Sequence, residues 1–250
     1  MDSHDTVTLV IVRDLNKPKG FGEIHFHAQF SRGLSPIGPV FQAISVRSSA
    51  CGELTFLTGK RDGHEEILNG RSIRSVIEDE FGEHLDYPLC YIGITRKGKR
   101  FTGLESSPLS FYAVEEDSDD YLSVCGDGIH TRDYFQFYQI DINLALTSCN
   151  EVSTNITNLN LKWEPQRNAM ARCSRNEYIG GFVFACCSRG GNFFGRLGVN
   201  SFPLLNNFPE APLTGVFLYG EVARGFPTGY PAHCCLHVYS SVYLVLSYTP

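Results

Sequence analysis

The stretch Phe-Val-Phe-Ala-Cys-Cys-Ser-Arg-Gly-Gly, residues 182–191, decides the fold. Together with Gly181, its first six residues form a nearly uninterrupted apolar run, which is typical of a strand buried on both faces. The run stops abruptly at a serine, an arginine and two glycines. A buried strand that ends in this way delivers polar side chains and bare backbone to the edge of a sheet, where ligands bind in α/β proteins.

A second apolar run, residues 213–219, ends in the same way at Gly220-Glu221. We therefore expect two core strands whose ends converge on one crevice. Between them, residues 200–208 predict a short helix with a single apolar stripe, because three large apolar residues stand three apart. These residues are Phe202, Leu205 and Phe208.

The rest of the chain predicts many strands and few helices. The clearest helix covers residues 71–81, where apolar residues recur with a period of 3.6. A second helix is expected at 164–173, a turn at 35–39, an exposed connection at 145–161 and one long final strand at 236–248. Further strands are predicted at 7–12, 23–30, 41–47, 54–57, 89–95, 110–114, 121–125 and, as strand or irregular structure, 133–140. The fold class is α+β, with a mixed, largely antiparallel sheet and a few flanking helices.

Composition excludes several classes of function. The chain has 250 residues and a net charge of −6, which argues against a nucleic-acid surface. No stretch reaches the roughly 18 apolar residues that a membrane span needs, and the acidic N-terminus is unlike a signal peptide. The nine cysteines stand in apolar contexts, as expected of reduced cysteine in the cytoplasm or nucleus. The basic cluster at 96–100 is interpreted as a charged hairpin turn.

Several stretches together carry a family resemblance. A buried strand ends in Cys, x, Arg, Gly; a Pro-Leu-x-Gly element ends in Gly-Glu; and the last strand opens on a histidine followed by a serine pair. This order resembles the C-terminal half of the FIST domain (F-box and intracellular signal transduction), as found in plant F-box proteins. The matching residues are Cys186 or Cys187, Arg189, Gly190, Gly215, Gly220, Glu221, His237, Ser240 and Ser241.

The resemblance implies two kinds of function. In eukaryotic members the FIST region is the substrate-receptor part of a Skp1–cullin–F-box ubiquitin ligase, and in prokaryotic members it resembles a small-molecule sensor with amino acids as suggested ligands. The resemblance implies one domain over 1–250, with the core motifs in 66–250 and strands of the N-terminal FIST half in 1–65. No leucine-rich F-box is visible, so recruitment to Skp1 is expected only through a partner.

Arg189 and Glu221 are the first candidate ligand-binding pair. A guanidinium beside Gly190 and Gly191 is suited to hold a carboxylate in a fork, and Glu221 after Gly220 is suited to accept an amine. Together they would hold an α-amino acid or a peptide end. The alternative is an ion pair between Arg189 and Glu221 that ties two strand ends together.

Cys186 and Cys187 are the second candidate. A catalytic thiol needs a base or a lowered pKa, for which His237 and Arg189 are the candidates. The alternative places one cysteine in the core and one at the strand end, with His237 and Ser240 in hydrogen bonds of a strand. A zinc site at 233–237 lacks a second ligand pair, and no nucleotide motif is present, so no metal and no cofactor are expected.

These observations favour a non-enzymatic binding module that recognises a protein substrate or a small amino-acid-like ligand. The expected site is the crevice of Cys186, Cys187, Arg189, Gly190, Gly220, Glu221, His237 and Ser240. A thiol enzyme and a structural remnant that only dimerises are the other hypotheses.

Overall fold

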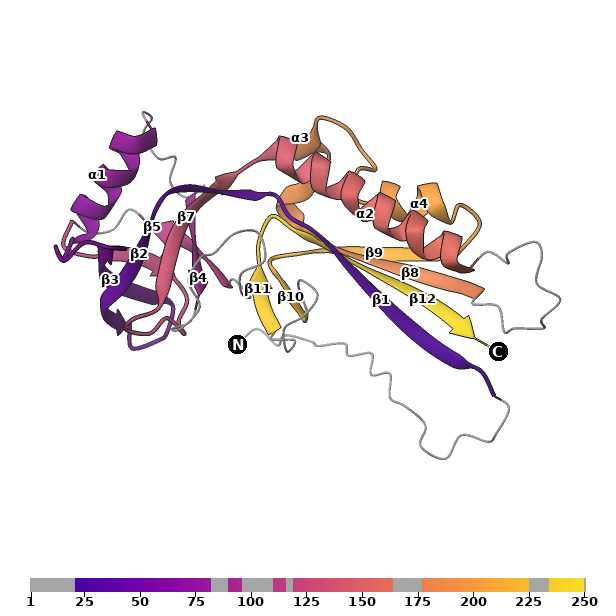
Figure 1. Cartoon of the computed structure of the whole chain (residues 1–250), viewed down its shortest axis with the longest axis horizontal. Coiled ribbons are helices and arrows are strands. Elements are labelled where there is room, and N and C mark those ends of the chain that lie inside the picture. The colour runs from indigo at the N-terminus through magenta and orange to yellow at the C-terminus, as the bar shows by residue number, and fades with distance from the viewer. Residues whose placement is uncertain are drawn as a thin grey trace, which may run out of the picture.

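The computed structural model describes residues 21–81, 90–95, 110–115, 119–163, 177–224 and 234–249. Within these residues the chain forms a closed barrel and a separate four-stranded sheet, which lie at opposite ends of an elongated molecule (Figure 1). The strands predicted at 7–12, the basic cluster at 96–100 and the helix predicted at 164–173 lie outside the described residues.

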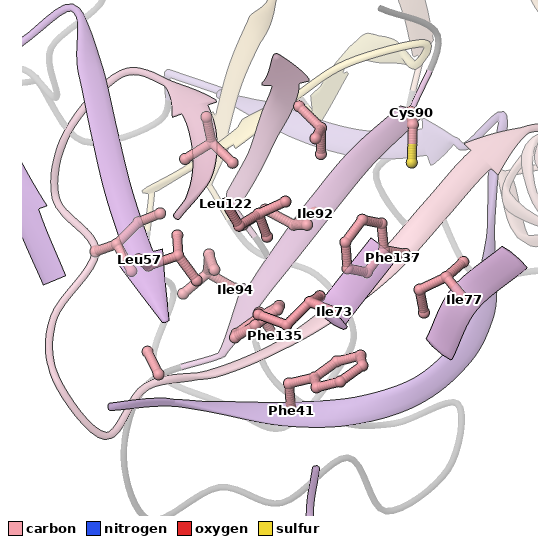
Figure 2. Packing of buried hydrophobic residues seen from close by; sticks show 14 of the residues in the cluster. Phe41, Leu57, Ile73, Ile77, Cys90, Ile92, Ile94, Leu122, Phe135 and Phe137 are labelled. Atoms are coloured by element: carbon pink, nitrogen blue, oxygen red, sulfur yellow. The ribbon is translucent and has the colours of Figure 1, made fainter. Parts of the chain in front are cut away.

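The barrel is antiparallel throughout. Its six strands run in the order β2, β3, β6, β5, β4, β7. Period-two alternation points one face of each strand inward, and the core is rich in phenylalanine and isoleucine (Figure 2). The strands are β2 (Leu34–Ser48), β3 (Leu54–Arg61), β4 (Cys90–Thr95), β5 (Ser110–Glu115), β6 (Leu122–Cys125) and β7 (Tyr134–Ile140).

Helix α1 (Gly70–Phe81) packs against the barrel, as the 3.6 periodicity predicts. Ile73 and Ile77 are fully buried in the barrel core. Asn69 caps the helix, since its Oδ1 accepts a hydrogen bond of 2.9 Å from the backbone N–H of Ser72.

The second sheet has the order β1, β12, β8, β9. The first three strands are antiparallel and β9 runs parallel to β8, so the sheet is mixed. Helices α2 (Ile142–Trp163) and α4 (Phe202–Asn207) cover one face (Figure 1). The strands are β1 (Glu23–Ser31), β8 (Glu177–Cys186), β9 (Leu213–Leu218) and β12 (Ser241–Thr249). The predicted α+β class, mixed and largely antiparallel, is confirmed.

Two short segments connect the sheet to its surroundings. After β8 the chain makes a 3-10 turn, η1 (Cys187–Arg189), and a short helix, α3 (Gly191–Phe194). Strands β10 (Glu221–Arg224) and β11 (Cys234–His237) form a two-stranded antiparallel ribbon, and β11 contacts β5 of the barrel.

Three local predictions were wrong. Residues 35–39 belong to strand β2, whose register shifts between Ile37 and Val40 around Gly38 at φ +62°. The connection predicted at 145–161 is most of helix α2. The single final strand is two strands, because Val238, Tyr239 and Ser240 separate β11 from β12 and Tyr239 has φ +48°.

Two burial predictions also need correction. The helix predicted between the two apolar runs exists as α4, but Leu204 and Phe208 are buried whereas Phe202 and Leu205 are about half exposed. Strand β9 lies at the edge of the sheet, and four of its six residues are exposed, so it is not a core strand.

Candidate functional site

Arg189 lies at the centre of the region that the sequence singled out. Strand β8 ends at Cys186, and η1 turns the chain so that the Arg189 side chain is wholly buried. Arg189 is the bulkiest of the fully buried side chains in the described part of the chain. A buried guanidinium requires acceptors on several sides, and the fold supplies them to Nη1 and Nη2 from distant segments, whereas Nε has no hydrogen-bond partner.

The Arg189 guanidinium donates four hydrogen bonds to the protein itself. Nη1 donates to the carbonyl oxygens of Ser31 (3.1 Å) and Tyr239 (3.0 Å). Nη2 donates to Ser31 Oγ (2.8 Å) and Cys149 Sγ (3.3 Å), and the Phe194 ring centroid lies 5.3 Å from the guanidinium carbon. The side chain therefore joins β1, α2 and the turn before β12.

Two successive hydrogen bonds hold the backbone of Arg189 in place. The side chain of Asn200 donates a hydrogen bond of 2.7 Å to the carbonyl oxygen of Arg189. Asn200 Oδ1 in turn accepts a hydrogen bond of 3.0 Å from Ser241 Oγ, and all three residues are buried. The start of β12 is thereby held next to η1.

Glu221, the first residue of β10, is a buried carboxyl group. Ser240 Oγ donates a hydrogen bond of 2.6 Å to its Oε2, whereas Oε1 has no partner. Burial raises the pKa of Glu221 from its ordinary value of 4.5 to about 7, although the Ser240 hydrogen bond and the charge of Arg189 act in the opposite direction. The carboxyl group therefore changes protonation near neutral pH.

The ion pair considered between Arg189 and Glu221 is not formed. Both residues are described, and no salt bridge within 4.0 Å joins them; the ion pairs found among the described residues involve side chains around the barrel. Arg189 is 0% exposed and Glu221 is 2% exposed, so neither presents its charged group to solvent. Their role as a clamp for an amino acid stays a prediction.

His237 ends β11 directly opposite Glu221. Its ring packs against Phe30, with centroids 4.3 Å apart, and lies 6.4 Å from the ring of Phe111. Its Nδ1 is buried without a hydrogen-bond partner. Burial lowers the pKa of His237 from 6.5 to about 4, so the ring is neutral at physiological pH.

The two cysteines occupy different environments. Cys186 is buried at the end of β8, and burial is the main cause that raises the pKa of its thiol. Cys187 is half-buried at the start of η1, with its Sγ 4.0 Å from Ser188 Oγ. A thiolate nucleophile needs the opposite shift from that of Cys186.

The fold brings most of the sequence-predicted residues into one buried cluster. Cys186 donates its backbone N–H to the Ser240 carbonyl oxygen (2.9 Å), and Ser240 bonds to Glu221, which faces His237 across the ribbon. Gly220 turns the chain between β9 and β10 at φ +91°, a conformation that favours glycine. Cys187 and Gly190 lie at the margin of this cluster and are less buried.

A pocket of ≈ 390 Å³ lies on the other side of Arg189, between β8, β9 and the segment 190–201. Of the proposed site residues, the structure places only Arg189 and Gly190 in the lining of this pocket, and the sequence analysis did not propose the other lining residues. The repeated glycines at 190, 191, 195 and 198 were the available signal, since glycine marks tight turns, and Gly195 and Gly198 do have positive φ angles of 64° and 79°. The lining includes Val183, Ala185, Phe194, Arg196, Leu197, Val199, Asn200, Leu213, Thr214, Val216 and Phe217.

Comparison of the chain with known proteins gives a relative in sequence but no matching family model or solved structure. No family model matches it, and no solved structure matches it significantly. An F-box/LRR-repeat protein of Arabidopsis thaliana is 34% identical over an alignment of 256 positions that covers 96% of this chain. The chain is related to an F-box protein. It spans about half (46%) of that relative's length.

This relationship supports the F-box side of the resemblance, whereas the FIST domain itself stays a prediction. Among the described residues, no helix is long and apolar enough to cross a membrane, and no three His, Cys, Asp or Glu side chains are grouped as metal ligands.

Proposed function

We propose that the chain is a non-catalytic recognition module of an F-box-type protein. In this role it binds the protein that a Skp1–cullin–F-box ligase ubiquitinates. The support is the relationship to an F-box/LRR-repeat protein over almost the whole chain. The chain spans 46% of that relative, and the contact with the ligase itself is assigned to a partner protein. Its expected location is the cytoplasm or the nucleus.

The observation that carries the proposal is a group of exposed apolar side chains around β9. Leu197 and Phe217 are 88% and 57% exposed, and both line the pocket. Val216 is half exposed beside them, and Tyr219, just after the strand, is 98% exposed. Apolar side chains that gather in this way at a hollow mark a site of interaction with another molecule.

The chemistry of the buried cluster favours binding over catalysis. The thiol of Cys186 has a raised pKa, so it carries little of the thiolate that a nucleophile needs. His237 has a lowered pKa and an orphaned Nδ1, so no group orients the ring as a base.

A small-ligand sensor is the second candidate, and the pocket is the observation that favours it. Its volume falls within the range of about 300–1,000 Å³ that is usual for small-molecule sites. Binding of free amino acids to the purified chain, measured by calorimetry, would support this second function.

The test of the first function is affinity purification of the tagged chain, with quantitative mass spectrometry. The wild-type chain is compared with Phe217→Asp and with the control Ile67→Asp. Ile67 is also an exposed apolar residue (61% exposed), but it lies far from Phe217 in the sequence. We expect Skp1 and cullin with the wild type and with both variants, and client proteins only with the wild type and Ile67→Asp. Absence of every ligase component from the wild-type sample would contradict the proposal.

A further inference from the structure

Strand β9 is an edge strand with a free side. It pairs with β8 through residues 213–218 and has no second strand partner in the part of the chain that the structure describes. In a strand, the N–H and C=O groups of alternate residues point to opposite sides, so about half of those in β9 face away from β8. These groups are available to a further strand.

This edge lacks the protection that natural sheets give to free edges. Residues 213–219, Leu-Thr-Gly-Val-Phe-Leu-Tyr, contain neither a charged residue nor a proline. Charges and prolines normally prevent unwanted strand pairing. The opposite edge strand, β1, carries Glu23, His25 and His27. An unprotected edge beside exposed apolar side chains is suited to β-augmentation, in which an extended peptide adds a strand.

The pocket adjoins this free edge. Leu213, Gly215 and Phe217 line it together with Val183 and Ala185, their neighbours on β8, so it lies over the helix-covered face. Thr214 and Val216 also line the pocket, although their side chains point to the opposite face of the sheet from those of Leu213 and Phe217. Because residues from both faces of β9 contact the pocket, it reaches the backbone edge of this strand. A strand added there would direct every second side chain toward the pocket.

The charged residues that line the pocket indicate the charge of the peptide that it would bind. Arg196 and Arg189 belong to the lining, which contains no aspartate or glutamate. The Arg189 side chain is engaged with protein groups, whereas Arg196 is exposed at the rim. The chain as a whole has a net charge of −6, whereas the rim of this pocket carries the positive charge of Arg196. This rim is therefore complementary to an acidic partner.

We infer that β9 and its pocket bind an extended, acidic peptide segment of the client protein by strand addition. One apolar side chain of the peptide fills the pocket, and a nearby carboxylate faces Arg196. The inference rests on the proposed recognition function and specifies how the chain binds its client protein, namely through an added strand.

The test starts with a phage-displayed library of random 12-residue peptides, selected on the purified full chain. The expected sequences combine an apolar residue with Asp or Glu and contain no proline at the centre. The best peptide is then synthesised in variants with a single N-methyl group at each position in turn. Strand addition predicts that N-methylation weakens binding at alternate positions only, because only those N–H groups face β9.

Protein variants locate the site. Phe217→Asp puts a charge among the apolar contacts of the pocket, and Arg196→Glu turns an attraction to the peptide carboxylate into a repulsion. Each is expected to weaken binding of the selected peptide about tenfold or more. Arg47→Glu and Ile67→Asp are matched controls, since both residues are exposed and lie far from β9 in the sequence; they should bind as the wild type does. Circular dichroism shows that each variant is folded.

Two results would overturn the inference. One is equal weakening by N-methylation at every position, and the other is full binding by Arg196→Glu and Phe217→Asp. If the affinity purification still recovers client proteins with these variants, the recognition function stands and only the β9 site is wrong. If no client is recovered even with the wild type, the function itself fails.

Discussion

Replacing Arg189 by methionine tests the central structural conclusion about the buried cluster. Methionine fills a similar space but cannot donate hydrogen bonds. The carbonyl oxygens of Ser31 and Tyr239 lose their guanidinium donor, at about 1–3 kcal/mol for each buried group left unpaired. The loss is partly offset, because the methionine variant no longer has to bury a charged group away from water. We therefore expect the free energy of unfolding to fall by about 2–5 kcal/mol.

The assay is urea and thermal denaturation of the full chain, followed by circular dichroism. For a protein of this size, each kcal/mol lowers the melting temperature by about 2–4 °C, so a shift of about 4–20 °C is expected. Arg196→Met is the matched control, because Arg196 is exposed seven residues further along and should change stability by less than about 0.5 kcal/mol. Equal stability of the two variants would refute the view that the Arg189 contacts hold β1, α2 and the turn before β12 together.

The remaining predictions concern protonation and capping. Between pH 4.5 and about 7 the folded protein keeps the proton on Glu221 and the unfolded chain releases it, so stability falls as pH rises through this window. Glu221→Gln should remove this slope and stabilise the protein at pH 8 by about 1–3 kcal/mol, which denaturation at several pH values measures; an unchanged slope would exclude Glu221 as its source. Asp141 caps α2, since its Oδ1 accepts a 2.8 Å hydrogen bond from the N–H of Leu144, and Asp141→Ala should cost about 1 kcal/mol in the same assay at pH 7, with Glu151→Ala, within α2, as the control.

Helix α2 shows why composition misled one prediction. Its many Asn, Ser and Thr residues indicate an exposed connection, yet residues 145, 148, 149, 152, 153 and 156 are buried at helical spacing. Some of these buried residues are polar because the sheet and its neighbours supply partners: Ser148 Oγ accepts the backbone N–H of Arg32, and Asn207 donates to Ser153. The period was readable, but the partners that make polar residues acceptable were not.

The sequence by itself determined the elements whose hydrophobic period is strong. Helix α1 lies where a 3.6 period predicts it, and strands β3 and β8 lie where apolar runs predict strands. The β8 run was expected to be buried on both faces, but its residues alternate between buried and partly exposed, so only one face is fully covered. The sequence also predicted that the strands in the two apolar runs end at the same place, and residues 181–186 and 213–218 do pair in parallel, so their ends lie at one edge of the sheet.

Only the tertiary structure decided what the polar residues do. Arg189 contacts Ser31, 158 residues away in sequence, and Tyr239, 50 residues away, so its guanidinium connects segments that nothing in the sequence marked as neighbours. Strand β9 is at an edge and β8 inside the sheet, although both are apolar runs. A period reports that a face is buried but not which strand covers it, so neighbours, and with them the pocket, follow from the complete fold.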